Sequence, residues 1–133
     1  MIREAVKEIL LASDAVNEIA EGRIFLGFRQ VNERRPSIVM MLLTTDPGHT
    51  FDGDGGYTAG TLKCDCLAPD PATAQALASA VNDTLDNYSG TVAEVVIDYI
   101  EVDNELDIPT VPLLGQAAPT FGVSVETSFQ YQH

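Results

Sequence analysis

The sequence predicts an α+β domain: a mostly antiparallel sheet with two helices packed on one face, in the order α-β-β-β-α-β-β. Two segments space their apolar residues at helical intervals, and five show the runs or alternation typical of strands. Strands follow one another directly, which favours antiparallel pairing with the helices gathered on one face. The chain has 133 residues, the usual length of one domain, and shows no internal repeat or linker. We therefore expect a single domain over residues 1–133.

The two helices are predicted from their apolar faces and their end signals. Residues 2–20 form the first, and Gly22 is a natural stop after it. The second has Asp70 as N-cap and Pro71 as its first helical residue, and Gly90 is expected to close it. Its apolar stripe is rich in alanine, so it can approach the sheet closely.

Five strands are predicted, at residues 23–29, 37–45, 57–67, 92–102 and 121–131. The second, SIVMMLLTT, is apolar in both alternating sets, which predicts a central strand buried on both faces. The third places Leu62, Cys64 and Cys66 on its core face. The last alternates most regularly, so one of its faces belongs to the core and the other is wet or at an interface.

Two segments are predicted to be long irregular loops. Asp46–Tyr57 contains five glycines or prolines among twelve residues, and residues 103–119 contain three prolines and one glycine. A long loop on a compact scaffold is commonly a recognition element. The sequence therefore suggests a small rigid domain that contacts partners through these segments.

Charge excludes two classes of function. The chain carries 20 acidic and 7 basic side chains, for a formal net charge of -13. Such a chain lacks the basic surface of a sequence-independent nucleic-acid binder or of a protein that docks on anionic lipid. No base follows Lys63, whereas residues 64–133 contain eleven acids. This asymmetry hints at two electrostatically different surfaces, but acids scattered over solvated faces, which only keep the chain soluble, explain it more simply.

An acid excess with only two lysines also suggests a halophilic or marine host, since in high salt the self-repulsion of the acids is screened within about 3 Å at 1 M. The apolar runs are too short to span a membrane, and the amphipathic N-terminus does not read as a signal peptide. Cys64 and Cys66 are expected to be buried free thiols, hence folded in a reducing compartment.

No catalytic, cofactor or metal site is predicted. His49, Asp52 and Asp54 could suggest a cation, but a calcium loop needs a third oxygen ligand at position 56, which is glycine. Acids in the same turn would repel phosphate. Neither His49 nor His133 stands beside a cysteine or serine in the sequence, so no nucleophile and base are paired there.

Several segments resemble the tail-completion, or tail terminator, family of long-tailed phages and gene-transfer particles. The similarity begins in the opening helix and continues through Gly22–Phe25, Arg35–Met40, the Thr50–Gly53 turn and Leu62–Ala68. It ends with the alanine-rich Ala72–Ala78 and the strand Val123–Phe129. The succession of these segments at this spacing covers nearly the whole chain.

The resemblance implies a non-enzymatic subunit of a hexameric ring that caps the tail tube and joins it to the head's connector, or stopper, protein. It would be assembled in the host cytoplasm and located in the virion tail, and DNA would pass through it without specific binding. Candidate partner contacts are His49, Phe51, Asp52, Asp54, Asp107, Val111, Leu113 and Leu114. The apolar members near Leu113 either dock on a partner or fold back over the sheet.

Acids of the second half are expected to line the channel, where they would repel DNA phosphates; the candidates are Glu94, Asp98, Glu101 and Asp103. Subunits of the ring are expected to bury a sheet edge against their neighbours. Two alternatives remain open at this point. One is another head–tail neck protein, a stopper or adaptor, and the other is a small acidic module that binds a metal or ligand through the Asp46–Tyr57 turn.

Overall fold

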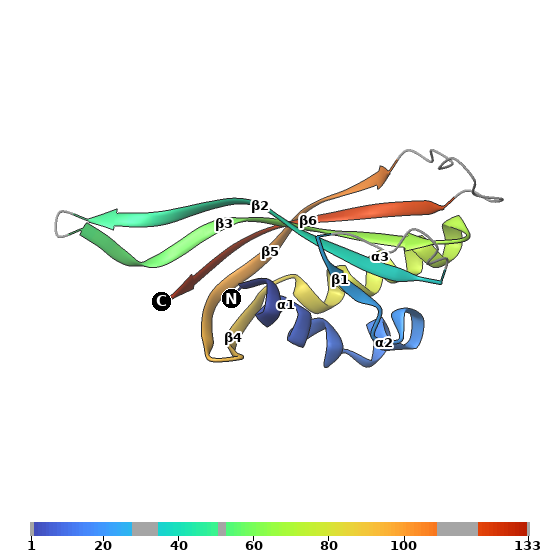
Figure 1. Cartoon of the computed structure of the whole chain (residues 1–133), viewed down its shortest axis with the longest axis horizontal. Helices are drawn as coiled ribbons and strands as arrows, with labels where there is room; N and C mark the ends of the chain where they lie inside the picture. Colours follow the sequence, from blue (N-terminus) through green and yellow to red (C-terminus); the bar gives the residue numbers. More distant parts are fainter. Residues whose placement is uncertain (1, 28–34, 51–52, 109–119, 133) are drawn as a thin grey trace.

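The computed structural model describes residues 2–27, 35–50, 53–108 and 120–132. Within them, three helices lie on one face of a six-stranded sheet, an α+β architecture (Figure 1). The sheet order is β1-β2-β3-β6-β5-β4, and every pairing is antiparallel except β1 with β2. The elements are α1 (Ile2–Leu11), α2 (Asp14–Ala20), β1 (Ile24–Leu26), β2 (Ser37–Thr50), β3 (Gly53–Ala68), α3 (Pro71–Leu85), β4 (Tyr88–Val92), β5 (Val95–Ile108) and β6 (Phe121–Gln132).

The expected helix over residues 2–20 is two helices, which corrects the prediction. Ser13 has extended backbone angles and caps α2, because its Oγ accepts a hydrogen bond from the Val16 N–H at 3.4 Å. The Thr84 hydroxyl also donates to Ser13 Oγ at 3.0 Å and ties this break to α3. Both helices contact α3 and β2, and α1 also contacts β4.

The start of α3 is as predicted. Asp70 is the N-cap, its carboxylate accepting from the Thr73 N–H at 3.4 Å and from the Thr73 hydroxyl at 2.5 Å. The helix ends at Leu85, earlier than expected, since Asn87 adopts a left-handed conformation and Gly90 lies in a further strand, β4. The observed order is therefore α-α-β-β-β-α-β-β-β rather than α-β-β-β-α-β-β.

Both expected loops are shortened by longer strands. β2 continues to Thr50 and β3 begins at Gly53, and the register between them absorbs two irregularities, at Leu42/Thr44 and Pro47/His49. These bulges let a stretch rich in glycine and proline remain paired where a turn was predicted. β5 likewise extends to Ile108, and residues 109–119 of the second predicted loop are outside the described residues.

The expectation that residues 37–45 form a central strand buried on both faces is wrong in part. β2 is next to the edge of the sheet, and its partner β1 covers only Ile38–Met40. Val39 is buried there, but Met41 and Leu43 are 39% and 44% exposed. The central position belongs to β6, which joins β3 to β5 and whose alternation was predicted correctly.

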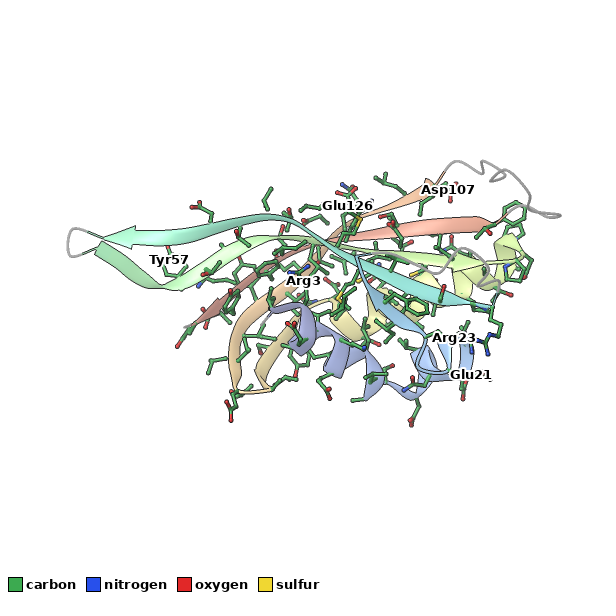
Figure 2. All side chains as sticks on the ribbon, in the orientation of Figure 1. Arg3, Glu21, Arg23, Tyr57, Asp107 and Glu126 are labelled. Carbon is green, nitrogen blue, oxygen red and sulfur yellow. The ribbon has the colours of Figure 1, made fainter. Side chains whose placement is uncertain are left out.

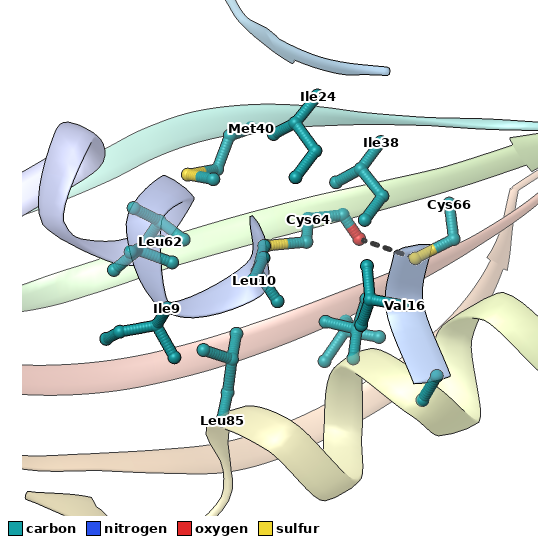
Figure 3. Packing of buried hydrophobic residues seen from close by; sticks show 14 of the residues in the cluster. Ile9, Leu10, Val16, Ile24, Ile38, Met40, Leu62, Cys64, Cys66 and Leu85 are labelled. Carbon is teal, nitrogen blue, oxygen red and sulfur yellow. Dashed lines mark hydrogen bonds between the residues drawn. The ribbon is translucent and has the colours of Figure 1, made fainter. Parts of the chain in front are cut away.

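The core lies between the sheet and the helices (Figure 3). Cys64 and Cys66 are fully buried in it as free thiols, which confirms the prediction, and Cys66 Sγ lies 3.8 Å from the Cys64 carbonyl oxygen. Burial raises the pKa of Cys64 to about 12 and raises that of Cys66 well above its usual value. Both thiols therefore stay protonated at neutral pH and behave as small apolar side chains.

Candidate assembly interface

The sheet has one face away from the helices, which we call the open face. The register places Lys63, Glu126 and Asn104 side by side on it, from β3, β6 and β5. Figure 2 shows Glu126 on the side of the sheet opposite the helices. Because no described helix covers this face, the polar half of each alternating strand is presented there.

The open face is acidic along β5. Asp98 accepts hydrogen bonds from the side-chain amides of Gln130, at 2.7 Å, and Gln132, at 2.8 Å. Asp103 accepts one from the Ser128 hydroxyl at 2.5 Å, and Glu101 is the register partner of Ser128. Three of the four acids expected to line a channel therefore share this face.

The fourth, Glu94, lies in the turn between β4 and β5 with a left-handed backbone and an exposed side chain. The turn places it away from the row along β5. The two glutamine contacts of Asp98 and the serine contact of Asp103 were missed by sequence reasoning. Their only sequence signal was the regular alternation of polar residues in β6.

The middle of the open face contains polar side chains with unsatisfied atoms. Lys63 Nζ lies 3.4 Å from Asp65 Oδ2, while Asp65 Oδ1 and the hydroxyl of its register partner Ser124 have no hydrogen-bond partner among the described residues. An unpaired buried polar atom costs about 1–3 kcal/mol. A polar group supplied from outside would therefore stabilise this part of the sheet.

The predicted partner contacts fall at opposite ends of the molecule rather than together. His49 and Asp54 are register partners near the tip of the β2–β3 hairpin, which projects beyond the helical layer (Figure 1). Asp107 is exposed at the far end of β5. Phe51, Asp52, Val111, Leu113 and Leu114 lie outside the described residues, as do the side chains of His49 and Asp54.

Asp107 borders a cavity of about 460 Å³ between the start of α3 and the ends of β5 and β6. Its lining includes Pro71, Ile108 and Phe121. Asp107 is the one predicted partner contact among the described residues that line this cavity.

Sequence reasoning also missed a set of exposed apolar side chains on the sheet. Met41 and Leu43 on β2 and Leu106 on β5 are 39%, 44% and 49% exposed. An apolar run had suggested burial on both faces, but pattern alone does not reveal that the neighbouring strand is only three residues long. These side chains lie at the two edges of the sheet, on strands separated by β3 and β6.

The described residues offer little for catalysis or cation binding. No three histidine, cysteine or carboxylate side chains gather in them as a metal site would require. The two thiols are buried and protonated, unlike catalytic thiols. In the same part of the chain, no helix has the length and apolar character to cross a membrane.

Comparison with known proteins decides the family. The model of the family described as tail completion protein gp17 matches residues 4–110. The chain belongs to this family. Membership makes it a structural protein of a phage-type virion tail and confirms the resemblance seen in the sequence.

Solved structures agree on the fold of this tail completion family member. A chain in the structure described as the virion of a native gene transfer agent particle matches with a TM-score of 0.73 and 11% identity, over 99% of this chain and 95% of that one. A second solved chain matches with a TM-score of 0.56 and 14% identity, over 96% and 92%. No curated protein matches significantly in sequence.

Proposed function

We propose that this tail completion protein forms a closed ring of identical subunits that ends the tail tube and joins it to the head-side connector or stopper protein. The observation that carries the proposal is the family match over residues 4–110. It is supported by a fold shared along almost its full length with a chain of a gene transfer agent virion. Six copies is the number that the resemblance implies.

The open face is the part of the subunit best suited to line the channel of such a ring. It carries Asp98, Glu101, Asp103 and Glu126 along two adjacent strands, and its one described base, Lys63, is paired with Asp65. Carboxylates facing a passing duplex repel its phosphates, so DNA would move through without binding. Helices would then lie on the outside of the ring.

The proposal has a direct test in solution and in particles. The mass of the purified chain is measured by light scattering in low and molar salt, alone and with its tail-tube protein. We expect a ring of about six copies, or one that forms only when the tube protein is present, since a closed ring needs head-to-tail contacts. A monomer that ignores the tube protein under all these conditions contradicts the proposal.

Electron microscopy of particles made without the chain separates the ring at the tube end from the alternative neck proteins. Loss of the terminator role predicts tubes of irregular length without heads. Tubes of normal length that fail to join heads would instead indicate a stopper or adaptor.

A further inference from the structure

Two segments at the edges of the sheet have no neighbouring strand among the described residues. β1 pairs with β2 only as far as Met40, so no described strand pairs with β2 on that side from Met41 onward. β4 pairs with β5 only as far as Ile100, so no described strand pairs with β5 on that side up to its end at Ile108. Open strand edges present N–H and C=O groups that can pair with another strand.

Local features limit each free edge to six residues. On β2, Pro47 lacks an N–H and ends the run, leaving Met41–Asp46. On β5, the Val102 N–H is already bonded to the Asp86 carboxylate at 3.0 Å, leaving Asp103–Ile108. We call these two segments the β2 edge and the β5 edge.

We propose that the β2 edge of one subunit pairs with the β5 edge of the next, as an antiparallel strand pair that continues the sheet from copy to copy. The occupant of each edge is thus a second copy of this chain. The inference deepens the proposed ring and rests on it, because it names the residues through which the subunits join.

Charge disfavours the pairing of two β5 edges. The β5 edge has three acids, Asp103, Glu105 and Asp107, and no base, so two β5 edges repel each other. The β2 edge has one acid, Asp46, among apolar and threonine residues. Joining unlike edges brings four acids together rather than the six of two β5 edges, with Asp46 and Asp103 as the one directly opposed acidic pair.

Exposed apolar side chains meet when the two edges are aligned end to end. In that antiparallel alignment Leu43 is opposite Leu106 and Met41 is opposite Ile108. Met41, Leu106 and Ile108 all project to the open face, according to their register partners within the subunit. Leu43 and Leu106 are 44% and 49% exposed in the single subunit, so the pair would remove both from water.

The geometry of the edges suits a closed ring. They lie on opposite sides of the sheet and toward opposite ends of it (Figure 1). The middle of the β5 edge is level with Val39–Met40, about four residues or ~13 Å along the strands from the middle of the β2 edge. From the β2 edge of one subunit to the β2 edge of the next there are four strand-to-strand spacings of ~4.8 Å. An offset of ~13 Å over that width tilts the strands by about 35° from the ring axis, close to the ~35–45° of closed barrels.

The test uses single cysteines at the two edges and a short bifunctional maleimide. Leu43→Cys and Leu106→Cys proteins are treated separately and as a mixture, while the native thiols stay buried and protonated. We expect a cross-linked dimer only in the mixture, and a ladder ending in a closed ring when one chain carries both changes. Val96→Cys, at a side chain that is 41% exposed where β4 covers β5, is the matched control and should not cross-link with Leu43→Cys.

Two substitutions of opposite charge at position 43 supply a second readout. Leu43→Glu adds an acid opposite the acidic β5 edge and should weaken assembly at least tenfold, whereas Leu43→Lys should assemble as well as the unmodified chain. Far-ultraviolet circular dichroism and thermal melts check that both variants fold. Equal assembly of the two variants would overturn the pairing.

The outcomes separate this inference from the proposed function. Rings that form without the mixed cross-link overturn the edge pairing and leave the ring standing. Mixed cross-links in open chains without rings support the pairing and contradict the ring. Cross-links in Leu106→Cys alone or Leu43→Cys alone indicate like-edge dimers, and a monomer that cross-links nowhere overturns both proposals.

Discussion

Gly60 and Phe129 face each other across the β3–β6 pair, and the ring of Phe129 occupies the space that a side chain at position 60 would need. A Cβ on Gly60 would lie 3.0 Å from Phe129 Cζ and 2.1 Å from the backbone oxygen of Thr44. The second contact is with backbone beside the β2 bulge, which has no free side chain to move away. Glycine at position 60 is thus required by the approach of β2 to the core strand.

Gly60→Ala should lower the free energy of unfolding by about 3 kcal/mol, because backbone must shift to accommodate the new methyl group. Urea unfolding followed by circular dichroism measures the loss. Gly56→Ala is the control: its φ is +77° but nothing lies within 4 Å of the added atom, so we expect a loss of about 1 kcal/mol. Equal losses at the two positions would contradict the close approach at Gly60.

The buried thiols should make the folded chain less stable in alkali. Burial raises the pKa of Cys64 from 9.0 to about 12, so above pH 9.0 the unfolded chain loses this proton while the folded chain keeps it. Stability is then unaffected by this thiol below the unfolded pKa and falls above it, by up to about 1.4 kcal/mol per pH unit. Cys66 contributes in the same direction.

Urea unfolding between about pH 8 and about pH 11 measures this slope. The matched variant Cys64→Ala removes one thiol, and its stability should fall less steeply over the same range. A variant with the same slope as the unmodified chain would show that Cys64 titrates alike in both states.

Reversing the charge of the open face should create affinity for DNA. Glu101→Lys, Asp103→Lys and Glu126→Lys in one chain place three bases on adjacent strands of that face. Assembled rings of the unmodified chain should not bind duplex DNA at about 0.05 M salt, whereas rings of the variant should bind with a strong salt dependence. Fluorescence anisotropy of labelled DNA provides the measurement.

The control is a chain with the same net charge changed on the helical side, by Glu8→Lys, Asp14→Lys and Glu18→Lys on α1 and α2. Rings of this control variant should have a lower affinity for duplex DNA than rings of the open-face variant, because their added bases lie outside the channel. Similar affinity for both variants would mean that the open face does not line the channel.

Added salt should stabilise the chain. With a net charge of -13 and few bases to pair the acids, folding brings like charges together, and salt screens their repulsion. We expect the melting temperature to rise by several degrees between about 0.1 M and about 1 M KCl. A melting curve that does not depend on salt would contradict both the repulsion and the inferred high-salt host.

Much of the fold follows from local sequence. Asp70 and Pro71 begin α3 as their capping chemistry predicts, and the C-x-C pair lies in the core because Leu62, Cys64 and Cys66 alternate with polar residues. The alternation of β6 likewise predicts one core face and one polar face. In each case the signal is contained within a few residues.

The sequence-based predictions are wrong where contacts between distant residues determine the bounds of an element or the exposure of a side chain. Ser13 breaks the first helix partly through its bond to Thr84, 71 residues away. Register irregularities at Leu42/Thr44 and Pro47/His49 allow β2 to continue through a stretch that reads as a turn. The exposure of Leu43 depends on the three-residue length of β1 and therefore cannot be obtained from the apolar pattern around it.

The candidate interface, too, depends on contacts that local sequence does not reveal. The acids of β5 could be selected from charge alone, and three of them share the open face. Their placement depends on a register irregularity at Asp98 that turns the carboxylate toward Gln130 and Gln132. A simple alternation counted along β5 from Val96 would have put Glu101 on the core face, because it ignores this irregularity.

The central position of β6 affects the order in which the molecule can be made. During synthesis, residues 37–68 and 88–108 emerge before residues 121–132, which join their strands into one sheet. Until then β3 and β5 each lack a partner on the side that β6 will occupy. The nascent chain therefore passes through a stage that is prone to pair with other chains on the same polysome, and it gains its mature shape only after β6 leaves the ribosome.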